Sequence, residues 1–88
     1  MSKILVVDDD KNILDAFEQV LTEHGYNVSR ARHGREALDL LQAERADLVI
    51  MDIRLPGISG LETLQKIKEF NAKLPVIIIT GYGRWKRP

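Results

Sequence analysis

Four short apolar runs divide the chain, and each favours a β-strand. They cover residues 4–7, 26–31, 47–51 and 76–79; the second alternates apolar with polar side chains, and the others are almost continuously apolar. Continuous runs of this length are typical of strands buried on both faces, and alternation is typical of a half-exposed edge strand. We therefore predict three buried strands and one edge strand.

Helical patterns occupy the segments between these runs. Their apolar residues recur every three or four positions, which places them on one face of a helix. The three stripes are Ile13, Leu14, Phe17, Val20 and Leu21; Ala37, Leu38, Leu40 and Leu41; and Leu61, Leu64, Ile67 and Phe70. Asp10 and Ser59 are suited to cap the first and third helices, and Gly25 to end the first. Strands that alternate with helices predict an α/β fold with a parallel sheet and helices on both faces.

Length and charge limit the classes of function. The chain has 88 residues, enough for one small domain, and 13 basic residues balance 13 acidic ones. A net charge of zero provides no general field to attract nucleic acid or an anionic membrane, so we predict direct binding to neither. Three of the cations, Arg84, Lys86 and Arg87, lie together in a short basic tail at residues 84–88.

Two further features of the composition favour the cytoplasm. The chain contains no cysteine, so neither a disulfide nor a thiolate metal site can hold the fold. The first residues lack the long apolar region of a signal peptide, and no apolar stretch approaches the length of a membrane span. We expect a cytoplasmic protein.

Polar side chains follow three of the predicted strands directly. Asp8 and Asp9 come after the first strand, Asp52 after the third and Thr80 after the fourth. In parallel α/β sheets, ligands bind outside the carboxyl ends of the strands, where these residues meet. Three carboxylates gathered there would repel one another unless a cation neutralised them. Mg²⁺, which prefers oxygen ligands and retains sites for phosphate oxygens, is the natural partner.

The chemistry of these residues suggests separate roles. Asp52 closes an apolar run, where an acid has no evident benefit for folding, so it is the candidate nucleophile toward phosphorus. Asp8 and Asp9 would hold the metal, and the Thr80 hydroxyl could donate a hydrogen bond to a phosphoryl oxygen. Asp10 is interpreted as a helix cap rather than a member of the site.

These residues stand in segments that resemble the receiver domains of two-component response regulators. The segments are Ile4–Asp10, Leu48–Gly57, Ser59–Gly60 and Pro75–Thr80, and the resemblance extends to Gly83. It implies a flavodoxin-like fold with strand order 2-1-3-4-5, and two-component signal transduction with phosphorylation by a sensor histidine kinase. The segment from Thr80 to Gly83 looks like receivers of nitrogen-regulation-type transcription activators.

The resemblance also implies a role for each residue of the site. It identifies Asp52 as the phosphoacceptor, Asp8 and Asp9 as the acidic metal pair, and Thr80 as the switch hydroxyl. It adds Arg54, whose backbone carbonyl would also bind Mg²⁺. Such a domain is a phosphoacceptor rather than an enzyme, with at most self-phosphorylation from small phosphodonors and self-dephosphorylation.

The family pattern continues beyond the segment that matches it here. A receiver should proceed through a fourth helix, a fifth strand and a fifth helix, whereas Arg84–Pro88 follow Gly83. We therefore expect a partial receiver at residues 1–83, with four strands in the order 2-1-3-4. The family's lysine and aromatic switch residue on the fifth strand have no counterpart, so we expect slower phosphorylation and impaired output switching. An exposed edge at residues 76–79 would favour self-association as a dimer or larger assembly.

Two alternatives belong to other classes. The chain could be a truncated fragment that self-associates without signalling. It could also be a haloacid-dehalogenase-type phosphohydrolase, because Asp8 and Asp10 have the spacing of its two acids, but Lys11 stands where a small Thr or Val is expected, and Asp52 is left unexplained. A flavodoxin-type FMN site is disfavoured because the chain lacks a hydroxyl-rich phosphate loop.

Overall fold

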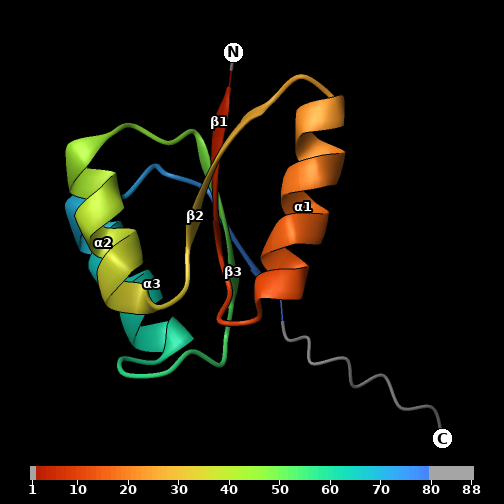
Figure 1. The fold of residues 1–88 in the computed structure, drawn as a ribbon. Coiled ribbons are helices and arrows are strands. Elements are labelled where there is room, and N and C mark those ends of the chain that lie inside the picture. Colours follow the sequence, from red (N-terminus) through yellow and green to blue (C-terminus); the bar gives the residue numbers. More distant parts are fainter. Residues whose placement is uncertain (1, 80–88) are drawn as a thin grey trace, which may run out of the picture.

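A parallel four-stranded sheet lies between two layers of helices in the computed structural model, which describes residues 2–79 (Figure 1). In chain order the elements are β1 Lys3–Val7, α1 Lys11–Glu23, β2 Asn27–Ala31, α2 Gly34–Ala43, β3 Leu48–Asp52, α3 Gly60–Phe70 and β4 Val76–Ile79. The strand order is β2-β1-β3-β4, with every neighbouring pair parallel. The predicted alternation of strands and helices and the predicted strand order are confirmed.

The register of the sheet aligns the carboxyl ends of its strands. Val7, the last residue of β1, lies between Ala31 of β2 and Met51 of β3. One position further along β3, Asp52 lies opposite Ile79 of β4. The loops that follow β1 and β3 therefore leave the sheet at the same edge.

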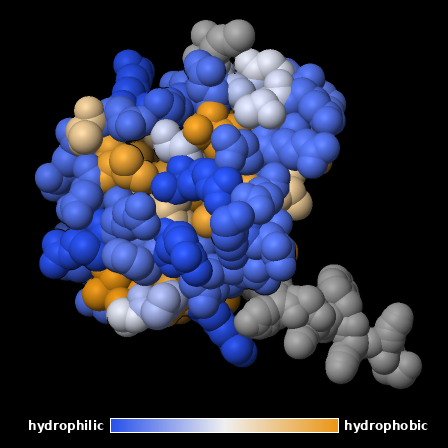
Figure 2. Space-filling view, in the orientation of Figure 1, coloured by the Kyte–Doolittle hydropathy of each residue, from blue (hydrophilic) through white to orange (hydrophobic). Residues whose placement is uncertain are grey.

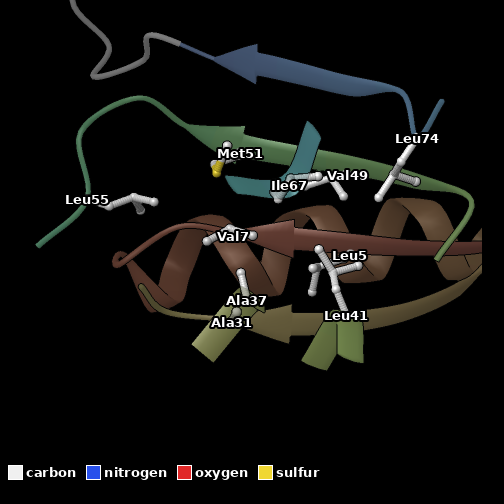
Figure 3. Close-up of a cluster of buried hydrophobic side chains, with 10 residues drawn as sticks. All are labelled: Leu5, Val7, Ala31, Ala37, Leu41, Val49, Met51, Leu55, Ile67 and Leu74. Atoms are coloured by element: carbon white, nitrogen blue, oxygen red, sulfur yellow. The ribbon is translucent and has the colours of Figure 1, made fainter. Parts of the chain in front are cut away.

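The larger core lies between the sheet and helices α2 and α3. Its buried side chains point from both layers toward one another (Figure 3): Leu5, Val7, Ala31, Ala37, Leu41, Val49, Met51, Leu55, Ile67 and Leu74. Burial of this apolar surface supplies the main driving force for folding. A smaller cluster on the opposite face packs Leu14 of α1 against Ile4, Val6 and Ile50. The helices thus cover both faces of the sheet.

Side-chain caps begin the three helices. The Asp10 carboxylate accepts the Asn12 N–H at 2.9 Å and caps α1, as predicted. The Ser59 hydroxyl likewise accepts the Glu62 N–H at 3.1 Å and caps α3. In α2 the cap is His33, whose Nδ1 accepts a hydrogen bond from a backbone N–H of the first turn. These caps fix where each helix leaves the carboxyl edge of the sheet.

Two apolar side chains of α1 are less buried than their stripe predicted. Ile13 is 37% exposed and Val20 is 52% exposed. The opposite side of the helix carries Asp15 and Glu18, which form ion pairs with Arg30 of β2 at 2.9 and 2.8 Å. The helix therefore leans toward β2, and within residues 2–79 no helix besides α1 covers this face of the sheet (Figure 1).

The burial predicted for α3 was also wrong at two positions. Leu61 is 59% exposed and Phe70 is 56% exposed, whereas Thr63 is fully buried. Thr63 faces Gly34 of α2 so closely that a Cβ atom on the glycine would lie 2.2 Å from the Thr63 hydroxyl oxygen. Close approach of the two helices turns the Thr63 side of α3 inward and leaves Leu61 in solvent.

The surface seen in the orientation of Figure 1 is mostly hydrophilic, with small apolar areas between polar side chains (Figure 2). No helix among residues 2–79 has the length and apolar character needed to cross a membrane.

Candidate functional site

Three carboxylates converge at the carboxyl edge of the sheet. Asp8 and Asp9 follow β1, and Asp52 is the last residue of β3. One carboxylate oxygen from each residue can be chosen so that all three lie within 4.8 Å of one another. The sequence predicted this grouping, and the parallel pairing of β1 with β3 produces it.

Asp8 is held in a buried position. Its side chain is 4% exposed, and Oδ1 accepts the Asp10 N–H at 2.9 Å. The Asp8 N–H donates to the Ala31 carbonyl at 3.0 Å, which extends the pairing of β1 with β2 by one residue. Burial raises the pKa of Asp8, and the negative charges of Asp52 and Asp9 raise it further, although the bond from Asp10 opposes them.

Asp52 is equally restrained at the centre of the sheet. It is 5% exposed, and Oδ1 accepts the Arg54 N–H at 3.0 Å. The next residue, Ile53, donates its N–H to Ile79 of β4 and accepts the Gly60 N–H, both at 3.0 Å. The backbone next to Asp52 is therefore hydrogen-bonded to β4 and to the start of α3.

Asp9 differs from its two partners because it is exposed. Its carbonyl oxygen accepts a hydrogen bond from Nη2 of Arg32 at 3.1 Å. Arg32 follows β2 and so belongs to the same edge of the sheet. Arg32 was not predicted as a site residue, although it directly follows a strand, the same signal that identified the aspartates.

Of the two other predicted site residues, Arg54 lies within the described residues and Thr80 does not. Arg54 lies in the loop directly after β3, where its N–H contacts Asp52 as described above. That position is consistent with the expected proximity of the Arg54 backbone to the acidic cluster. Thr80, the predicted switch hydroxyl, lies outside the described residues, as does the predicted basic tail.

The donor set suits a hard divalent cation. It consists of carboxylate oxygens with three formal negative charges, and such ligands match the preference of Mg²⁺. In both Asp8 and Asp52, backbone N–H groups fix one oxygen, Oδ1, and the structure gives no hydrogen bond from residues 2–79 to the other. The residues present therefore fit a metal bound through one oxygen of each carboxylate.

A parallel sheet of this order, with an acidic pair after β1 and a buried aspartate closing β3, defines a flavodoxin-like phosphoacceptor class. The response regulator receiver domain family matches residues 4–86, and the chain belongs to that family. Domains of this family are phosphoacceptors in two-component signalling rather than classical enzymes. Family membership also removes the basis for a haloacid-dehalogenase interpretation, as does the use of Asp10 as a helix cap.

Among curated proteins, the chain is 41% identical over 81 residues to sporulation initiation phosphotransferase F of Bacillus subtilis, covering 92% of this chain and 65% of that protein. It spans between 18% and 34% of the length of several other curated relatives.

Solved structures give the same result. The response regulator TrrA from Thermotoga maritima in complex with Mg(2+)-BeF has a TM-score of 0.89 and 41% identity, covering 98% of this chain and 75% of that one. TrrA in complex with the histidine kinase ThkA has a TM-score of 0.88 and 40% identity, covering 100% and 76%. The predicted fold and family are confirmed.

Proposed function

We propose that this chain accepts a phosphoryl group on Asp52 in a Mg²⁺-dependent reaction, with a sensor histidine kinase as the donor. The observation that carries the proposal is the position of Asp52, buried at the end of a central strand with oxygens of Asp8 and Asp9 within 4.8 Å. Burial of an acid there costs free energy, so the arrangement is best explained by chemistry at that carboxylate.

Asp52 would act as the nucleophile. The Arg54 N–H orients the carboxylate through Oδ1. Of the two carboxylate oxygens, one would hold the metal and the other would attack phosphorus. A bond forms between that oxygen and phosphorus while the bond from phosphorus to the donor breaks. The leaving group keeps the electron pair of the broken bond: an imidazole nitrogen for a phosphohistidine, or a carboxylate oxygen for an acyl phosphate.

The acidic cluster would provide the metal site. Carboxylates of Asp8, Asp9 and Asp52 would hold Mg²⁺ together with the backbone carbonyl of Arg54. When bound, the metal neutralises negative charge on the transferring group and on the aspartates. Support comes from the oxygen-only donor set and from TrrA, which was solved with Mg(2+)-BeF. The Thr80 hydroxyl would complete the site by donating to a phosphoryl oxygen.

Family membership supports the choice of a kinase partner. TrrA, a similar structure, was solved in complex with the histidine kinase ThkA. The carboxyl edge that carries Asp52 is also where the exposed Asp9 lies, so a phosphohistidine could approach from this edge. The cytoplasmic location expected from the sequence stays a prediction.

Intact-mass analysis after treatment with acetyl phosphate and Mg²⁺ tests the phosphoacceptor role. The wild-type chain should gain the mass of one phosphoryl group, and this adduct should be lost in Asp52→Asn and when EDTA replaces Mg²⁺. Asp39→Asn, which changes an exposed aspartate on α2, is the matched control and should keep the adduct. A time course of the same adduct tests the expected slow phosphorylation.

The result separates the alternatives. No adduct on the wild-type chain would contradict the proposal and favour a non-signalling fragment. An adduct that persists in Asp52→Asn and maps to Asp8 would contradict the assignment of Asp52 as the nucleophile.

We also propose that the chain self-associates through the face shared by α1 and β4. Ile77 of β4 is 50% exposed, and Val20 of α1 is 52% exposed on the same face of the sheet. Within residues 2–79, β4 pairs only with β3, so its other edge offers unpaired backbone groups to a second copy. Contact between two copies would bury the exposed apolar side chains and pair the free edge of β4.

A further inference from the structure

Asp9 is the least restrained of the three carboxylates in the proposed metal site. Asp8 and Asp52 are buried, and each accepts a backbone N–H through its side chain. Asp9 is exposed, and its carboxylate accepts no hydrogen bond from residues 2–79. Its position therefore depends on how the backbone of the β1–α1 loop is held.

Arg32 holds that backbone. Its Nη2 donates to the Asp9 carbonyl oxygen at 3.1 Å across 23 positions of the chain. The contact links the loop after β1 to the loop after β2, two segments that leave the sheet at the same edge. Among the hydrogen bonds within residues 2–79, it is the one that involves the Asp9 backbone.

The backbone of Arg32 is itself held by a hydrogen bond. The Arg32 N–H donates to Oε1 of Glu36 at 2.9 Å, and the Glu36 N–H donates to Nδ1 of His33 at 3.3 Å. Both bonds lie in the first turn of α2, a helix that packs into the larger core through Ala37. The backbone from which the Arg32 side chain extends is therefore held against the start of a packed helix, within reach of the Asp9 carbonyl.

Little else supports Asp9 from this side. A hollow of about 430 Å³ lies beside it, lined by Asp9, Arg32, His33, Glu36 and Pro56. Among residues 2–79, the lining of the hollow is polar except for Pro56. The guanidinium of Arg32 is the group that bridges it.

We propose that Arg32 is a positioning residue that holds Asp9 in place for metal binding. The inference rests on the proposed metal site. Two effects of Arg32 oppose each other: its positive charge disfavours a nearby cation, whereas its hydrogen bond organises a ligand. The charge is exposed and is screened by water and salt, so the positioning effect dominates.

A titration of the 88-residue chain with Mn²⁺ tests the positioning role of Arg32. Binding is monitored as the loss of the free-ion signal in electron paramagnetic resonance. Arg32→Met should weaken Mn²⁺ binding about tenfold, the lower end of the effect of residues that orient metal ligands. Arg32→Lys retains the charge and a donor, and should restore part of the affinity. Arg35→Met removes an exposed charge from the same turn of α2 and should not weaken binding.

The outcomes distinguish charge from position. Equal or tighter binding by Arg32→Met would overturn the proposal, because charge removal alone predicts that result. Weaker binding by Arg35→Met of the same size would also overturn it. If the wild-type chain binds Mn²⁺ no better than Asp8→Asn, the proposed metal site itself fails. Thermal unfolding in EDTA should be unchanged in Arg32→Met, and a large drop would assign Arg32 to the fold instead.

Discussion

At the scale of single residues, Asp8 links the site to the stability of the fold. Burial and neighbouring carboxylates raise the pKa of Asp8, so the folded chain holds this proton to a higher pH than the unfolded chain does. As the pH rises from the ordinary carboxyl range through the raised pKa, the free energy of unfolding falls. At neutral pH, the ionised Asp8 therefore destabilises the metal-free chain.

Asp8→Asn should remove this cost while retaining an oxygen that can accept the Asp10 N–H. We expect the metal-free variant to have a higher free energy of unfolding than wild type at pH 7, and to lose that advantage in acid. Wild type should gain about 1.4 kcal/mol from Mg²⁺ at ten times its dissociation constant, and the variant much less. Urea unfolding with EDTA or Mg²⁺ measures both, and a metal-free variant less stable than wild type at pH 7 would contradict the argument.

At the scale of elements, the backbone at the start of α3 packs closely against the backbone at the end of β3. A Cβ atom on Gly60 would lie 2.6 Å from both Cα and the carbonyl oxygen of Ile53 and 2.7 Å from the Asp52 carbonyl oxygen. These are backbone atoms, which cannot move aside as a flexible side chain can. Glycine at this position therefore sets how closely α3 approaches the backbone that carries the phosphoacceptor candidate.

Gly60→Ala should force β3 and α3 apart. We expect a loss of about 1–3 kcal/mol in stability and about tenfold slower phosphorylation of Asp52, because small displacements of reacting groups are costly. Gly25→Ala is the control: its φ of +89° makes alanine strained, but nothing lies within 4 Å of the added atom. Gly25→Ala should lower stability without changing the phosphorylation rate at a temperature where both variants are folded. Equal rates for Gly60→Ala and wild type would contradict the coupling.

At the scale of the whole molecule, the two faces of the sheet are covered unequally within residues 2–79. Helices α2 and α3 cover one face, whereas α1 covers the other (Figure 1). Ion pairs with Arg30 tie α1 to β2, at the end of the sheet order opposite β4. Alternation along β4 sends Val76 and Ile78 into the larger core and turns Ile77 to the less covered face. Exposed apolar side chains and a strand edge therefore occur together, as at many association surfaces.

Self-association of the 88-residue chain should accordingly depend on Ile77. Light scattering at micromolar concentration should detect a dimer or larger assembly, and Ile77→Thr should raise its dissociation constant about tenfold or more while keeping a strand-favouring residue. Leu61→Thr alters a comparably exposed apolar residue, 59% against 50% for Ile77, on the other side of the molecule, and should leave association unchanged. A stable wild-type monomer at micromolar concentration would exclude the proposal.

Much of the architecture was predictable from local patterns. The seven elements, the caps Asp10 and Ser59 and the gathering of Asp8, Asp9 and Asp52 follow from periodicity and from residues placed at strand ends. The roles of Asp52 and Arg54 remain proposals, and Thr80 lies outside the described residues. The burial of α3 was misjudged because helical periodicity identifies a stripe but not which edge of it meets a neighbouring helix.

The sequence by itself determined the order and type of the elements and the acidic character of one sheet edge, because these depend on neighbouring residues and on strand direction. The tertiary structure decided which side chains became buried and which loops touched. Thr63 faces inward because Gly34 admits close helix packing, and Arg32 reaches Asp9 because two loops distant in sequence leave the sheet side by side. Such contacts depend on the relative placement of whole elements, which no local pattern specifies.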